Sequence, residues 1–310
     1  MATSPSTPRP CSPGTTASTS PTATSPASPP PSPPACAERS GRGGMRRWGH
    51  AHPPQVPSRR PARVLRRGGR GLAWLAEPDA VPVVRVLAAD EHGLDLERLE
   101  PVPADAAAAR RLGGQLARLH DAGAPAFGWA PAPRAWFGPL EAPFAVPTAP
   151  RAEFSVFWAE DRLRPLAQRT APLLGDEGAD AVEAAIAAIA AGVFDGIAGQ
   201  GREEPARVHG DLWSGNVLWT AAGGTLIDPA AHGGHRLEDL ALLTLFGAPH
   251  LEEILAGYEQ AHPMPEGWRE DLPAHLFFAL LAHLDLFGTG YAADAIRTAQ
   301  RIVRRAEEIA

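Results

Sequence analysis

The chain has 310 residues, a formal net charge of −6 at pH 7 and a hydrophobic content of 44%, which is typical of a soluble globular protein. No run of uncharged apolar residues reaches the roughly 20 needed to cross a bilayer, which argues against an integral membrane protein. Cys11 and Cys36 are the two cysteines, and both lie near the start, which excludes a disulfide framework or a cysteine-based metal site. All 29 basic residues are arginine, so the sequence contains no lysine.

The composition changes sharply near residue 70. Residues 1–70 are rich in Pro, Ser and Arg and hold 11 arginines but one acidic residue, Glu38. We predict that this segment is of low complexity and has no packed core. Three explanations stay open: translation of GC-rich DNA in a wrong frame or from a wrong start, a genuine disordered tail, or a targeting segment. Residues 71–310 carry a formal charge of −16, which argues against nucleic-acid binding by that part.

From residue 71 onward the pattern is that of a folded, mostly helical domain. Residues 80–88 and 94–99 are rich in branched apolar side chains and predict two short strands. Residues 105–120 predict a helix, since leucines repeat there every three or four positions. Residues 208–218 and 224–227 predict a strand–loop–strand unit. Further helices are expected over residues 152–166, 179–193, 237–246, 251–261, 272–287 and 292–309.

The strand–loop–strand unit carries the residues with chemistry. It reads His209-Gly210-Asp211, then four intervening residues and Asn216, and Asp228 twelve positions after Asn216, behind a short apolar strand. Phosphoryl transfer needs a carboxylate that accepts the proton of the attacking hydroxyl, and further oxygen ligands for the magnesium ion on the phosphates. The spacing follows the logic of the kinase motifs H-R-D-x-x-x-x-N and D-F-G. By itself the pattern is weak, because Asp, Asn and Gly also cluster in ordinary turns.

Longer strings make the assignment more specific. The segments HGDLWSGN and IDPAAHGGHRLEDLALLTLFG resemble the fructosamine/ketosamine kinase family, and the similarity extends over about residues 71–305. The resemblance implies an α+β, protein-kinase-like fold of the aminoglycoside-phosphotransferase type. It implies a cytoplasmic enzyme that uses ATP and Mg²⁺ to phosphorylate a sugar hydroxyl of a small-molecule or protein-bound ketosamine, in protein deglycation repair. Residues 71–101 would be the end of the N-terminal lobe with the hinge, and residues 102–310 the C-terminal lobe.

Five roles follow from the resemblance for the residues of the motif. Asp211 is expected to be the catalytic base, with His209 orienting its loop. Asn216 and Asp228 are expected to be the Mg²⁺ ligands. Trp213 would line the ketosamine site, although a packing role in the core fits it as well.

Two further expectations concern residues outside the motif. Asp239 would accept hydrogen bonds from the backbone of the catalytic loop. Backbone atoms of Glu97 and Leu99 would contact the adenine. His232 and His235 lie close to Asp228 in the sequence, but without a third ligand they do not predict a zinc site.

The resemblance fails at its N-terminal end. A kinase of this class also has a phosphate-covering loop, a lysine on the α- and β-phosphates and a helix glutamate that pairs with it. The chain has no lysine, and Gly68, Gly69 and Arg70 stand where the glutamate is expected. Two alternatives therefore stay open: a related phosphotransferase that acts on an aminoglycoside-like substrate, or a catalytically inactive binding protein. The sequence makes no prediction of the oligomeric state.

Overall fold

The computed structural model describes residues 62–90, 93–132, 135–138 and 143–310, apart from the side chains of residues 62–68 and 135. Helix α1 (Ala62–Ala76) crosses the boundary predicted at residue 70, and the rest of the predicted low-complexity segment lies outside the described residues. No helix among the described residues has the length and apolarity of a membrane span.

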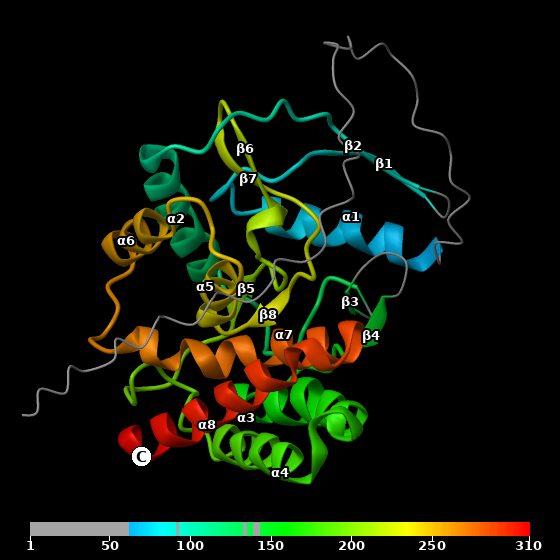
Figure 1. Ribbon diagram of the computed structural model, residues 1–310. Helices are drawn as coiled ribbons and strands as arrows, with labels where there is room; N and C mark the ends of the chain where they lie inside the picture. The colour runs from blue at the N-terminus through cyan, green and yellow to red at the C-terminus, as the bar shows by residue number, and fades with distance from the viewer. Residues whose placement is uncertain (1–61, 91–92, 133–134, 139–142) are drawn as a thin grey trace, which may run out of the picture. The chain divides into compact units, whose positions relative to one another are not determined.

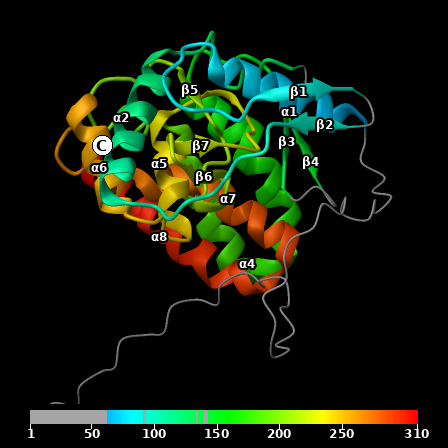
Figure 2. The ribbon, with the colours of Figure 1, turned by 90° about the horizontal axis from the view of Figure 1, so that it is seen from above.

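The N-terminal part of the described chain is a helix beside a small antiparallel hairpin. Strand β1 (Val86–Ala89) pairs with β2 (Leu94–Leu96), and both contact α1 (Figures 1 and 2). The strand predicted over residues 80–88 forms only at its end. The first part of that stretch pairs instead with Leu226, which donates to the Pro82 carbonyl and accepts from the Val84 N–H group.

Helices α2 (Ala106–Asp121) and α6 (Leu251–Ala261) pack together with their backbones in contact. The α2 helix begins at Asp105, whose carboxylate accepts the Ala108 N–H at 2.7 Å. A Cβ atom added to Gly113 would lie 1.8 Å from the Ile254 carbonyl oxygen. One added to Gly257 would lie 1.9 Å from the Arg110 carbonyl oxygen. The two glycines therefore allow a helix crossing that no larger residue permits.

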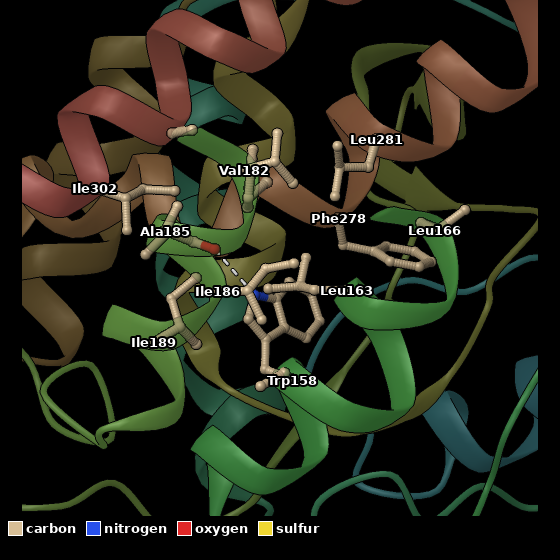
Figure 3. Close-up of a cluster of buried hydrophobic side chains, with 14 of the residues drawn as sticks. Trp158, Leu163, Leu166, Val182, Ala185, Ile186, Ile189, Phe278, Leu281 and Ile302 are labelled. Carbon is tan, nitrogen blue, oxygen red and sulfur yellow. Dashed lines mark hydrogen bonds between the residues drawn. The ribbon is translucent and has the colours of Figure 1, made fainter. Parts of the chain in front are cut away.

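A helical layer follows in the C-terminal half, and a buried apolar cluster joins its helices (Figure 3). The layer consists of α3 (Phe154–Val156), the π-helix η1 (Phe157–Leu163), α4 (Arg164–Ala190), α7 (Leu272–Phe287) and α8 (Ala292–Ile309). Trp158 Nε1 donates to the Ala274 carbonyl oxygen at 2.9 Å, and Figure 3 shows a dashed line from the ring nitrogen of Trp158.

Two of the predicted helices differ from the observed ones. The helix expected over residues 152–166 is largely π-helical. This wider turn brings residues five apart into contact, so the Arg162 guanidinium lies 4.5 Å from the centre of the Phe157 ring. The helices expected over residues 152–166 and 179–193 also run into one another, with a break at Gly175, whose φ is 69°.

The central β element consists of two antiparallel pairs that flank the predicted catalytic motif, residues 209–216. Strand β5 (Ala206–Val208) pairs with β8 (His232–Gly234), and β6 (Val217–Thr220) pairs with β7 (Gly223–Leu226). Helix α5 (Arg236–Leu245) follows β8 directly. The structure adds a hairpin that was not predicted, made of β3 (Ala135–Phe137) and β4 (Phe144–Val146).

Candidate active site

Asp211 and Asn216 lie in the loop between β5 and β6 and contact each other. The short helix η2 (Ser214–Asn216) turns the chain back, because the Asn216 N–H donates to the Trp213 carbonyl at 2.9 Å. The Asn216 amide nitrogen donates to the Asp211 backbone carbonyl at 2.8 Å and to its carboxylate at 3.2 Å. The amide oxygen of Asn216 is thereby left free to act as a ligand.

Asp228 reaches the same loop from the end of β7. The Ile227 N–H donates to the Asn216 carbonyl at 3.1 Å, and the Asn216 side chain lies 3.5 Å from the Asp228 carbonyl oxygen. Asp228 has a φ of +49°, a left-handed conformation that is rare outside glycine and concentrates at functional sites. The structure therefore brings Asp211, Asn216 and Asp228 together, although 17 positions separate the first and last of them.

His209 joins the two arms of this site. Its Nε2 lies 2.8 Å from the Ile227 carbonyl oxygen, and the Asp211 N–H donates to its Nδ1 at 3.3 Å. Burial lowers the pKa of the imidazole, which is therefore neutral. The neutral ring thus donates from Nε2 to one arm and accepts at Nδ1 from the other.

Asp239 on α5 binds the backbone of the same loop. Its carboxylate accepts the His209 N–H at 2.7 Å and the Gly210 N–H at 2.9 Å. His120 on α2 contacts it at 3.1 Å, and the Tyr258 hydroxyl lies 2.8 Å from the other nitrogen of His120. Burial by itself would raise the pKa of Asp239, but these hydrogen bonds and the neighbouring histidines lower it below its ordinary value.

The environment of Asp211 shifts the pKa of its carboxyl group in the opposite direction to that of Asp239. Burial, Asp228 and Asp239 raise the pKa of its carboxyl group to about 7, although the hydrogen bond from Asn216 works against the shift. A carboxylate with a pKa near neutrality is a stronger base than an ordinary one, and it is about half ionised at pH 7 and mostly ionised at pH 8. The geometry and the pKa together suit Asp211 for accepting a proton from a bound hydroxyl.

Trp213 lies in the same loop, two residues after Asp211, and is only partly buried. Its indole covers the backbone of Gly215, where an added Cβ atom would lie 2.1 Å from a ring carbon. The indole meets Phe246 edge-on, and Phe246 in turn meets His283. Phe246 is 36% exposed, so these rings form a partly open aromatic surface beside Asp211.

The other positions singled out from the sequence lie outside the loop that contains Asp211 and Asn216. Glu97 extends the β1–β2 pair through its N–H group, which donates to the Arg85 carbonyl at 2.9 Å, and Leu99 follows it, half-buried. His232 contacts the Ala230 carbonyl and the Glu238 carboxylate, while His235 caps helix α5. The two histidines therefore have local structural contacts.

Arg162 and His275 are polar residues that the sequence analysis missed. Both are almost fully buried and line a cavity that also touches Gly210 of the catalytic loop. A charged residue on the otherwise apolar face of FWAEDRL was the available signal for Arg162. His275 gave no signal, since it belongs to no motif and stands in a mostly apolar helix.

The family model for fructosamine kinase matches residues 63–305. The chain belongs to the fructosamine kinase family. The match begins at the start of α1 and continues into the last helix, so it contains the whole site described above.

Individual relatives agree with this assignment. A probable ketoamine kinase of Thermus thermophilus is 32% identical over 74% of this chain and 79% of its own length. One from Enterococcus faecium is 41% identical, but the match spans only 32% of that protein. The crystal structure of a proposed fructosamine-3-kinase from Thermobifida fusca has 38% identity and a TM-score of 0.70, with 78% of this chain and 80% of that chain covered.

These comparisons confirm three of the sequence predictions. The family is the one that the HGDLWSGN and GGHR segments indicated. The fold is α+β and kinase-like, as in the Thermobifida structure. The family is one of kinases, so its enzyme class is that of phosphotransferases.

Proposed function

We propose that this chain transfers the γ-phosphoryl group of ATP to a sugar hydroxyl of a ketosamine, in the repair of glycated amines in the cytoplasm. The observation that carries the proposal is the convergence of Asp211, Asn216 and Asp228 on one loop, in a chain of the fructosamine kinase family. The Thermus relative is described as a probable ketoamine kinase, which supports the same substrate class.

In this proposal Asp211 accepts the proton of the sugar hydroxyl. The hydroxyl oxygen forms a bond to the γ-phosphorus, the bond from that phosphorus to the β,γ-bridging oxygen breaks, and ADP leaves with that electron pair. The Asp211 carboxylate holds the released proton. Asn216 donates one hydrogen bond to the Asp211 carboxylate and a second to the Asp211 backbone carbonyl, which keeps this residue in place.

The donor set of the site fits a magnesium ion. The Asn216 amide oxygen and the Asp228 carboxylate are hard oxygen ligands of the type that Mg²⁺ prefers. The amide nitrogen of Asn216 is already engaged by Asp211, which directs the amide oxygen toward a cation. When bound, Mg²⁺ would neutralise the charge on the phosphates.

Trp213 and the aromatic surface beside it would contact the sugar-amine. Partly exposed aromatic rings bind the apolar face of a sugar and the amine substituent with little loss of side-chain entropy. Backbone atoms of Glu97 and Leu99 would contact the adenine. The chain that follows them pairs with β6, because the Val102 N–H donates to the Trp219 carbonyl at 2.8 Å.

A transfer assay tests the proposal directly. The full chain is incubated with Mg-ATP and the fructosamine of butylamine, and formation of the sugar phosphate is followed by phosphorus NMR. We expect turnover in the wild-type chain, with kcat/KM rising with pH through about 7 as Asp211 ionises. Asp211→Asn should remove turnover and leave the fold intact; turnover retained in this variant would contradict the assignment of the base.

The absence of lysine favours a second candidate, a ketosamine-binding protein without turnover. A compact ammonium group on the α- and β-phosphates is not reproduced by the planar fork of an arginine. This candidate predicts that the fructosamine binds equally well to the wild type and to Asp211→Ala, and that no sugar phosphate appears.

A further inference from the structure

Behind the catalytic loop lies a narrow cavity that contains buried polar atoms without partners. Its walls come from the β3–β4 hairpin, η1, α5, α7 and the catalytic loop, and it admits a group about the size of a water molecule. The polar lining consists of Arg162, His232, Glu238 and His275.

Arg162 is the most unusual of these residues. It is 3% exposed, its Nη1 donates to the Pro147 carbonyl at 2.7 Å, and its Nη2 is buried without a hydrogen-bond partner. The guanidinium forms no salt bridge with any described carboxylate. Burial lowers its pKa to about 10, so it keeps its charge at neutral pH. A buried cationic N–H group without an acceptor is costly, and such groups in native structures call for an explanation.

His275 faces the same cavity. It is 2% exposed and stacks on Phe154 and against His235, with ring centroids 5.1 and 4.2 Å apart. Neither of its ring nitrogens has a partner. Burial lowers its pKa to about 3, so the ring is neutral and offers one donor and one acceptor.

The charge of the lining restricts what the cavity can bind. A cationic group in the cavity would be repelled by Arg162, and an anionic group would be repelled by Glu238. Both carboxylate oxygens of Glu238 are already engaged, by the His235 N–H at 2.6 Å and by His232 at 3.1 Å. The cavity therefore offers two unsatisfied hydrogen-bonding groups, the charged Nη2 donor of Arg162 and the neutral imidazole of His275. A neutral hydroxyl group satisfies both, since its oxygen accepts from Arg162 and exchanges a hydrogen bond with His275.

The position of the cavity indicates where that hydroxyl comes from. Gly210 and Ala230 line it; Gly210 directly precedes Asp211, and Ala230 lies two residues after Asp228. A substrate whose reacting hydroxyl is at Asp211 has further hydroxyl groups one or two carbons away. Resting on the proposed function, we propose that this cavity is a specificity site that binds a second, non-reacting hydroxyl of the ketosamine sugar through Arg162 and His275.

The test combines variants of the chain with substrate analogues that each lack one hydroxyl. The fructosamine of butylamine and its monodeoxy analogues are titrated into the full chain by calorimetry without ATP. Arg162→Met should weaken binding of the parent compound about 10- to 100-fold, the range expected for loss of a charged hydrogen bond. For one analogue, the one that lacks the bound hydroxyl, wild type and Arg162→Met should bind within about twofold of each other.

Two further variants keep the test decisive. His275→Phe retains the aromatic stack and should weaken the parent compound about 2- to 10-fold, with no further loss for that same analogue. Arg164→Met is the matched control, because Arg164 is two positions away but pairs with Glu160 and Glu183 at the surface. It should bind every compound as the wild type does.

The proposal would be overturned if, for every analogue, the loss of binding free energy from Arg162→Met simply added to the loss from the missing hydroxyl. Additive losses would mean that Arg162 contacts none of the hydroxyl groups removed. A change of thermal stability with unchanged binding would overturn it too, and would assign the cavity to an ordered water molecule. Because binding is measured without ATP, a wild-type chain that binds but transfers no phosphate would contradict the proposed function and leave the site supported.

Discussion

Replacing Asp211 by Asn should make the folded protein more stable at alkaline pH while removing its activity. The raised pKa of this carboxyl group, about 7 against an ordinary value of about 3.9, means that ionisation is less favourable in the folded chain than in the unfolded one. The folded state therefore loses stability as the pH rises from about 4 to about 7. An amide of the same shape avoids this penalty.

The size of the effect follows from the shift. A difference of about 3 pKa units corresponds to about 4 kcal/mol of unfolding free energy once both states are ionised. The Asp211 side chain is only half-buried, and solvent screening should reduce this to about 2 kcal/mol. At pH 5 the folded carboxyl group is mostly protonated, so the gain from Asp211→Asn should be below about 1 kcal/mol.

Urea unfolding at pH 5 and pH 8, followed by tryptophan fluorescence without divalent cations, measures both values. Asp239→Asn is the control with the opposite sign, because its lowered pKa stabilises the fold above pH 4 and that contribution is lost as the pH falls through the folded pKa. This variant should be less stable than the wild type at pH 8. Equal effects of Asp211→Asn at the two pH values would refute the reasoning.

Four other substitutions, one of them a control, test the helix packing and the surroundings of the site. Gly113→Ala should unfold the chain or cost more than about 3 kcal/mol, because the new methyl group meets the α6 backbone; Gly114→Ala, with its nearest contact at 3.5 Å, should change the urea midpoint little or raise it. Gly215→Ala should displace the Trp213 indole, so the ketosamine KM should rise while the unfolding free energy changes by less than about 0.5 kcal/mol. His120→Leu should lower the unfolding free energy by about 3 kcal/mol, since it removes a partner of a buried carboxylate; a loss below about 1 kcal/mol would show that the network adjusts without it.

The sequence was sufficient to predict the bounds of those elements whose local sequence pattern agrees with their packing. Helices α6, α7 and α8 have the predicted bounds, because glycine or proline residues separate their apolar patterns. The proximity of Asp211, Asn216 and Asp228 was predictable for a similar reason, since one stretch of the sequence contains all three; their catalytic and metal-binding roles stay predictions.

The remaining features depend on partners that are distant in the sequence. Strand β8 contains two glycines and forms only because β5 lies beside it. The π-helix η1 buries its apolar side chains and brings Arg162 onto the Phe157 ring, and no local propensity indicates this arrangement. The cavity joins Arg162 to His275, which lie on different helices, so no motif could have indicated it.

The contacts of Asp239 affect how this chain tolerates damage far from the site. One carboxylate on α5 holds the backbone of the catalytic loop and, through His120 and Tyr258, is connected to α2 and α6. The conformation of the loop therefore depends on the packing of these helices. Lesions in α2 or α6, remote from any substrate, should reduce the fraction of active molecules while each remaining folded molecule works at full rate.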